Sequence, residues 1–215
     1  MSQQTVHLAV YDTLADWEAS YAIAAINHPQ FQHAPGRLRV ATVAERLDPV
    51  TTMGGVRIQP ELDLATVDPQ DSAMLILSGS ELWEQGQSKA MAAAARRFLD
   101  AGAPVAAICG ATFGLALEGL LDDRDHTGAA PEYLAASGYG GAERYRDERV
   151  VSDRGVITAG PTEPVPFARE ILAMLDVYAP PVLDAWFGLY DTGEPRYFYE
   201  LMAAVEAQGS ALAQT

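Results

Sequence analysis

The chain has 215 residues, of which 49% are hydrophobic and 20% are charged, and its formal net charge is −15. This balance is typical of a globular protein, and the length is sufficient for one domain with a substantial core. The negative charge argues against nucleic acids and anionic membranes as partners, because their phosphates would be repelled. One cysteine cannot form an internal disulfide, no apolar run is long enough to span a bilayer, and the N-terminus lacks a signal-peptide pattern. We therefore expect a cytoplasmic protein.

The first half of the chain alternates between β-rich and helical segments. Residues 73–77 form a fully apolar run, which is typical of a short strand buried on both faces. Residues 89–101 have helical spacing and end at Gly102, a residue that commonly terminates helices. We expect strands over 5–11, 37–43 and 73–77, a β-hairpin over 50–59, and helices over 17–26 and 89–101.

The second half continues this alternation. We expect a strand over 105–108, a helix over 111–121, a second hairpin over 149–158 and a helix over 166–175. Strands that alternate with helices predict an α/β fold with a mostly parallel sheet covered on both sides. The segment beyond residue 178 reads as two further helices, the second from about residue 194. We accordingly assign residues 1–178 to the main domain and 179–215 to a helical extension packed on it.

The only cysteine, Cys109, lies at an abrupt turn between the strand 105–108 and the following helix. Such a turn pushes the side chain out of the sheet, and the helix N-terminus directs its free N–H groups and positive dipole end towards it. The position therefore predicts a nucleophile with a lowered thiol pKa. The alternative is a small buried side chain, which free cysteines often are.

Three strand ends are expected to meet at one edge of this sheet, because ligand sites form at the carboxyl ends of parallel strands. Glu18 follows the first strand, Gly79 and Ser80 follow the strand 73–77, and Cys109 and Gly110 follow the strand 105–108. Glycine permits close approach of the backbone, and backbone N–H groups can stabilise an oxyanion. The sequence thus predicts a carboxyl group, a glycine turn and a thiol around one cleft.

These segments resemble the ThiJ/PfpI (DJ-one-like) branch of the class I glutamine-amidotransferase-like superfamily. The similarity covers about residues 5–177, and it implies a flavodoxin-like three-layer sandwich with the cysteine on a nucleophile elbow. It also implies that Glu18 contacts the sulfur, that Gly79, Ser80 and Gly110 supply oxyanion-hole N–H groups, and that the protein is a homodimer. The motifs that carry it are 75–80, 106–110, 119–124 and 156–161, together with Glu18.

The chain also departs from this superfamily. Glutaminases need a late His-x-Glu pair, and no histidine follows His126, so a glutaminase triad is excluded. Family proteases place a histidine directly after the cysteine, where this chain has Gly110. His126 is the remaining candidate base, with Asp125 as its orienting partner, although many relatives carry the histidine where this chain has Ala129. His126 is otherwise a structural histidine.

Two functions remain open from the sequence. The first is a cysteine-dependent hydrolase or lyase for a small carbonyl or amide compound, in which Cys109 attacks and Glu18 or His126 moves protons. The second is a non-enzymatic redox or stress sensor whose thiol is oxidised. We expect no metal or other cofactor. Trp17, Tyr11 and Trp83 line the pocket or belong to the core, and the C-terminal helices pack on the domain or mediate self-association.

Overall fold

The computed structural model describes residues 3–212 and contains a central sheet of seven strands in the order β5-β2-β1-β6-β7-β9-β8. All neighbouring strands are parallel except β8 and β9, which form the predicted second hairpin. The strands of this sheet are β1 (Gln4–Ala9), β2 (Leu38–Ala44), β5 (Leu62–Asp63), β6 (Ser72–Leu77), β7 (Val105–Ile108), β8 (Val150–Asp153) and β9 (Val156–Ala159). The small first hairpin also forms, from β3 (Val50–Thr51) and β4 (Arg57–Ile58).

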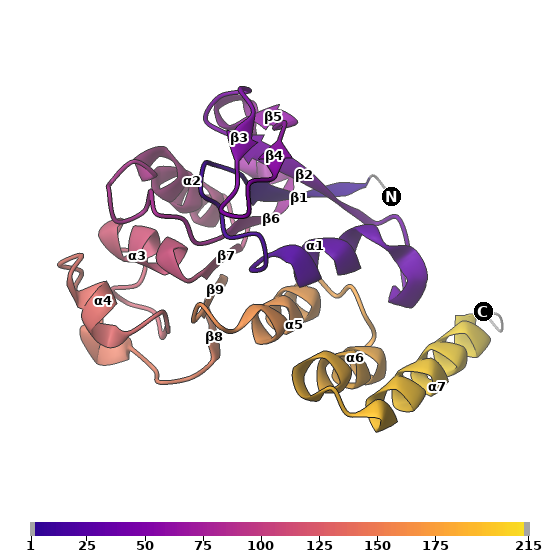
Figure 1. Cartoon of the computed structure of the whole chain (residues 1–215). Helices are drawn as coiled ribbons and strands as arrows, with labels where there is room; N and C mark the ends of the chain where they lie inside the picture. Colours follow the sequence, from indigo (N-terminus) through magenta and orange to yellow (C-terminus); the bar gives the residue numbers. More distant parts are fainter. Residues whose placement is uncertain (1–2, 213–215) are drawn as a thin grey trace.

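Within residues 3–212, seven α-helices surround the sheet, and Figure 1 shows them in two groups with the sheet between them. They are α1 (Ser20–Asn27), α2 (Lys89–Asp100), α3 (Gly110–Leu117), α4 (Pro131–Ala135), α5 (Pro164–Met174), α6 (Pro180–Thr192) and α7 (Pro195–Leu212). Four short 3₁₀ turns lie at Pro29–Phe31, Leu64–Thr66, Pro69–Asp71 and Ala142–Arg144. The predicted flavodoxin-like three-layer sandwich is therefore confirmed.

Alternation along the strands divides the core into two clusters, one on each face of the sheet. In β6, Met74 and Ile76 pack with α1, α5 and α6, whereas Leu75 and Leu77 pack with α2 and α3. This division follows from the two-residue period of a strand, which sends successive side chains to opposite faces. Because both faces are covered, β6 and β7 are apolar at almost every position, which is why their sequence shows no polar alternation.

The C-terminal helices belong to the same core as the sheet. Val182, Leu183 and Trp186 of α6 are buried in the cluster that contains α1 and α5, and α7 adds the buried Leu201. Gly193 ends α6 in the left-handed conformation with a φ of 71°, and Pro195 then begins α7. None of the helices within residues 3–212 combines the length and apolar character needed to cross a bilayer.

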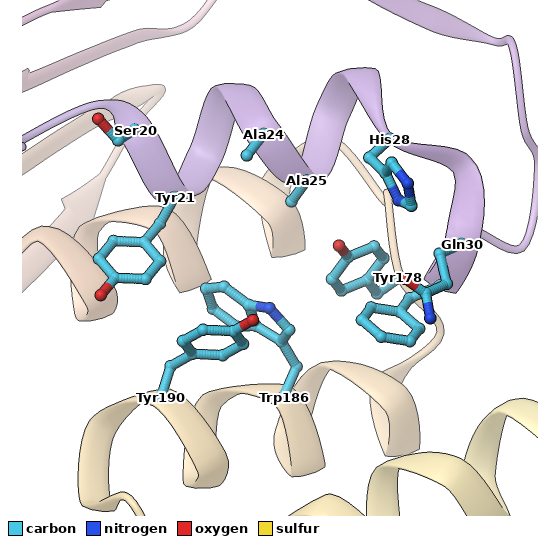
Figure 2. Close-up of a pocket in the computed structure, with 10 residues that line it drawn as sticks. Ser20, Tyr21, Ala24, Ala25, His28, Gln30, Tyr178, Trp186 and Tyr190 are labelled. Atoms are coloured by element: carbon cyan, nitrogen blue, oxygen red, sulfur yellow. The ribbon is translucent and has the colours of Figure 1, made fainter.

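An aromatic groove of about 410 Å³ runs between α1 and α6. Figure 2 shows Tyr21 descending from α1 towards Trp186 and Tyr190 of α6, with Tyr178 further along the groove. The rings of Trp186 and Tyr190 are 5.0 Å apart between centroids, and Tyr21 meets Tyr190 edge-on at 5.5 Å. These ring contacts connect α6 to α1. None of the predicted site residues lines the groove.

Candidate active site around Cys109

Three adjacent strands of the sheet place the predicted residues together. In the order β1-β6-β7, Glu18 follows β1, Gly79 follows β6 and Cys109 follows β7. Since these strands are parallel, their carboxyl ends open at one edge of the sheet. The topology predicted from the sequence thus brings the carboxyl group, the glycine turn and the thiol into contact.

Cys109 has the backbone of a nucleophile elbow. Its φ of 59° and ψ of −129° are rare for a residue with a side chain, and α3 begins at the next residue. The Cys109 N–H donates to the Ala159 carbonyl of β9 at 3.0 Å, and its carbonyl accepts from the Thr112 N–H at 3.1 Å and from Thr112 Oγ1 at 2.6 Å. These bonds hold a strained backbone that presents a half-buried thiol at the strand end.

Glu18 lies in a turn, one residue before the N-cap of α1, and its side chain reaches the sulfur from there. The sequence predicts instead that Glu18 belongs to the helix. Its side chain is completely buried, and Oε2 accepts the Gly79 N–H at 2.5 Å. A Cβ atom on Gly79 would lie 2.9 Å from Cys109 Sγ and 3.0 Å from Glu18 Oε1. Both atoms therefore flank the missing side chain of Gly79, and only glycine fits between them.

Burial and mutual charge set the protonation of this pair. Burial raises the pKa of Glu18 to about 7, although the hydrogen bond from Gly79 opposes the shift. The expected lowering of the thiol pKa is wrong, because burial and the facing Glu18 carboxylate raise the pKa of Cys109 to about 12. The Gly110 N–H at the N-terminus of α3 favours the thiolate, but its effect is smaller than that of burial.

The two groups consequently titrate as one system. From about pH 7 upwards the pair carries a single negative charge, since repulsion in a buried site opposes a second one. Glu18 Oε1 has no hydrogen-bond partner among the described residues, so a proton on this oxygen has only the sulfur to face. Because the pKa of Glu18 is the lower of the two, the single charge lies on Glu18, and Cys109 becomes a thiolate when its proton passes to Glu18.

Two aromatic side chains hold the glycine turn after β6 by hydrogen bonds to its backbone. Tyr11 Oη and Trp83 Nε1 both donate to the Ser78 carbonyl, the latter at 2.9 Å, and both side chains are buried. Of the aromatic residues expected around the site, these two therefore support the turn, whereas Trp17 is 49% exposed. The Gly79 carbonyl accepts the Ala15 N–H at 2.9 Å, which ties the turn to the segment that carries Glu18.

The three predicted oxyanion donors do not have equal roles in the structure. The Gly79 N–H is engaged by Glu18, as described above. The Gly110 N–H lies at the start of α3 beside Cys109, whose thiolate form it favours. The Ser80 N–H has no acceptor within the described part of the chain, while its hydroxyl is held by Thr13 Oγ1 at 2.8 Å. Ser80 and Gly110 thus remain the donors available to a ligand.

His126 is not the base of this site. Its Nδ1 is paired with the Arg124 carbonyl at 2.8 Å and its Nε2 with Tyr139 Oη at 2.9 Å, so both ring nitrogens are occupied. The residue is completely buried, and burial lowers its pKa. Asp125 does not orient it either, because that carboxylate binds Arg146 at 2.9 Å. His126 is the structural histidine of the alternative interpretation.

The other three histidines lie away from Cys109. His7 Nδ1 pairs with Ser72 Oγ at 2.7 Å at the amino end of the sheet, and His33 pairs with Asp176. His28 ends α1 and lines the aromatic groove. Across the described residues, no three histidine, cysteine or acidic side chains group as ligands for a metal ion. The site is therefore built from Cys109 and Glu18 without a histidine.

One residue near Cys109 was not predicted from the sequence. A Cβ atom on Gly110 would lie 3.5 Å from Tyr133 Oη, so this hydroxyl borders the elbow. Tyr133 belongs to the short helix α4, where its ring packs on Phe113 at 5.2 Å between centroids. The only feature of the sequence that could have indicated this residue is the presence of a tyrosine in the segment between α3 and β8.

A mostly parallel sheet with a strained cysteine at the end of an inner strand defines the class of α/β proteins with a nucleophile elbow. A model of the DJ-1/PfpI family matches residues 4–174 of this chain. The chain belongs to the DJ-1/PfpI family, as its motifs predict.

Relatives in sequence and solved structures agree with this assignment. The "Uncharacterized protease YoaZ" of Bacillus subtilis is 38% identical over 210 residues, which covers 95% of this chain and 99% of the relative. A second Bacillus subtilis relative, "Uncharacterized protease YdeA", is 30% identical over 80% of this chain and 83% of its own length. The crystal structure of a ThiJ/PfpI family protein from Bacillus anthracis has a TM-score of 0.88 at 36% identity and covers 95% of this chain and 99% of that one. A DJ-1 superfamily protein from Agrobacterium tumefaciens has a TM-score of 0.78 at 32% identity, covering 87% of this chain and 97% of that one.

Proposed function

We propose that this protein is a cysteine-dependent hydrolase that acts on a small amide or carbonyl compound. The observation that carries the proposal is the buried pair of Cys109 and Glu18 at a strained elbow, beside free backbone N–H groups. The names of the Bacillus subtilis relatives, which refer to proteases, support an amide bond as the bond that is cleaved.

The chemistry follows from the positions of these groups. Glu18 takes the thiol proton as the Cys109 sulfur attacks the carbonyl carbon, and the new oxyanion accepts hydrogen bonds from Ser80 and Gly110. The C–N bond then breaks as Glu18 gives its proton to the leaving amine, which forms a thioester on Cys109. Water attacks this thioester, returns a proton to Glu18 and releases the acid and the thiolate.

A substrate screen with intact-mass detection tests the proposal. We expect amide or thioester probes to leave an acyl group on Cys109, and we expect Cys109→Ser and Glu18→Gln each to reduce turnover at least a hundredfold. The matched control is Glu206→Gln, since this exposed carboxylate of α7 lies outside the site. Turnover in Cys109→Ser equal to that of the wild type would contradict the proposal.

A redox-sensing role is the second candidate, and the unpartnered Glu18 Oε1 favours it. Oxidation of the Cys109 thiol by peroxide to a sulfinate adds two oxygen atoms, and a protonated Glu18 can donate a hydrogen bond to one of them. Peroxide titration with peptide mapping tests this function. A sensor gives a stable gain of two oxygens at Cys109 that is slower in Glu18→Gln, whereas a site that resists oxidation rules it out.

A further inference from the structure

A tyrosine hydroxyl borders the elbow beside the two available backbone donors. Around the position that a Cβ atom of Gly110 would occupy lie Tyr133 Oη at 3.5 Å, the Ser80 carbonyl oxygen at 3.3 Å and Trp83 Cδ1 at 3.3 Å. The same small region therefore holds the hydroxyl and the backbone of both residues whose N–H groups remain available to a ligand. Because Gly110 has no side chain, residue 110 itself leaves the space beside this hydroxyl open.

Packing holds the Tyr133 ring in this position. Its helix α4 is anchored by Leu134, which is completely buried in the core cluster on the α2 and α3 face of the sheet. The ring itself lies against Phe113 of α3, with 5.2 Å between the centroids and 43° between the planes. Since α3 begins with Gly110, one helix positions both a backbone donor and the ring. A hydroxyl fixed in this way needs little reorganisation to meet a charge that forms beside it.

The Tyr133 hydroxyl is available as a hydrogen-bond donor. Within residues 3–212, the tyrosine hydroxyls that form hydrogen bonds are those of Tyr11, Tyr139 and Tyr197, and that of Tyr133 is not among them. Burial raises the pKa of Tyr133 above its ordinary value, so the hydroxyl keeps its proton at neutral pH. A neutral phenol therefore offers one O–H donor to a compound bound at Cys109.

We infer that Tyr133 is a further catalytic residue, whose hydroxyl joins the N–H groups of Ser80 and Gly110 as the side-chain donor of the oxyanion hole. Negative charge forms on the carbonyl oxygen only when the Cys109 sulfur attacks, so a donor that reaches this oxygen stabilises the transition state more than the bound substrate. This inference deepens the proposed hydrolase function and rests on it.

Two reactions of the same thiol separate an oxyanion donor from a residue that only shapes the site. With 4-nitrophenyl acetate, Glu18 takes the thiol proton and the sulfur bonds to the carbonyl carbon. The oxyanion then collapses, the C–O bond breaks, and 4-nitrophenolate leaves without needing a proton, which gives acetyl-Cys109. With methyl methanethiosulfonate, Cys109 attacks a sulfur atom instead, so a mixed disulfide forms, methanesulfinate leaves and no oxyanion arises.

Both rates are measured by intact mass in the wild type, in Tyr133→Phe and in Tyr199→Phe. Tyr199→Phe is the matched control, because this tyrosine of α7 is 72% exposed and lies outside the site. Cys109 is the only thiol, and Cys109→Ser gives the background of acetylation at other residues. Thermal unfolding of each variant shows that the fold is retained.

We expect Tyr133→Phe to slow the acetylation of Cys109 at least tenfold, since loss of one oxyanion donor costs about 10²–10³ in rate where the hole is well formed. Its rate with the methanethiosulfonate should stay within twofold of the wild type, and Tyr199→Phe should change neither rate. If Tyr133→Phe changes both rates equally, or changes neither, the inference is overturned.

The outcome for the hydrolase function is read separately. If acetyl-Cys109 forms in a manner that depends on Tyr133 but acetate is not released, the inference stands and the hydrolase function is contradicted. If acetate is released at the same rate with and without the Tyr133 hydroxyl, the hydrolase function stands and the inference fails. A wild type that reacts with the methanethiosulfonate but is not acetylated would contradict both.

Discussion

Replacement of Glu18 by glutamine should change how the stability of the protein depends on pH. The fully buried carboxyl has its pKa raised from 4.5 to about 7, so between these values the folded chain holds a proton that the unfolded chain has lost. The folded state therefore binds more protons, and stability must fall as pH rises through this window. At 1.36 kcal/mol for each pKa unit, the full loss is about 3 kcal/mol, of which roughly 2.5 kcal/mol falls between pH 5 and pH 8.

Urea unfolding of the wild type, Glu18→Gln and Glu206→Gln at pH 5, 6, 7 and 8 measures this effect. Contributions of other titrating groups are common to all three proteins and cancel in the differences. We expect the stability of Glu18→Gln relative to the wild type to increase by roughly 2–3 kcal/mol from pH 5 to pH 8, and Glu206→Gln to follow the wild type. Parallel curves for Glu18→Gln and the wild type would refute the reasoning, because they would show that Glu18 has an ordinary pKa.

Three other substitutions test the packing of the site and its surroundings. Gly79→Ala places a methyl group 2.9 Å from Cys109 Sγ, so iodoacetamide labelling followed by mass spectrometry should slow at least tenfold. His126→Phe should leave the labelling rate within twofold of the wild type but cost about 1–3 kcal/mol in urea unfolding, because two buried hydrogen bonds are lost. Unchanged labelling of Gly79→Ala, or slowed labelling of His126→Phe, would contradict the geometry described above. Gly114→Ala places its Cβ 2.2 Å from the Trp83 ring and should lower the thermal midpoint by several degrees, whereas an unchanged midpoint would count against this contact.

The sequence was sufficient to predict the fold and the three residues at the centre of the site, Glu18, Gly79 and Cys109. Short apolar runs such as 73–77 identify strands covered on both faces, and parallel strands open their carboxyl ends at one edge. This argument alone places Glu18, Gly79 and Cys109 together, without any knowledge of side-chain positions. The structure adds that Glu18 lies in a turn before α1, because the helix begins only at Ser20.

The parts that sequence reasoning missed depend on long-range packing. His126 is the last histidine in the chain and was therefore a candidate base, but its role is decided by Arg124 and Tyr139, which occupy its two nitrogens. The raised thiol pKa also depends on a tertiary contact, since burial and the Glu18 charge together outweigh the helix N-terminus. Tyr133 lies on a helix of five residues, a length at which periodicity carries no signal.

The most direct measurement is the pH dependence of Cys109 alkylation in the wild type and in Glu18→Gln. Cys109 is the only thiol, so intact mass reports its modification without background. If the pair holds one charge and shares its proton, the wild-type rate rises through about pH 7, as the first proton is lost, and Glu18→Gln loses this rise. Identical profiles in the two proteins would contradict a nucleophile controlled by Glu18.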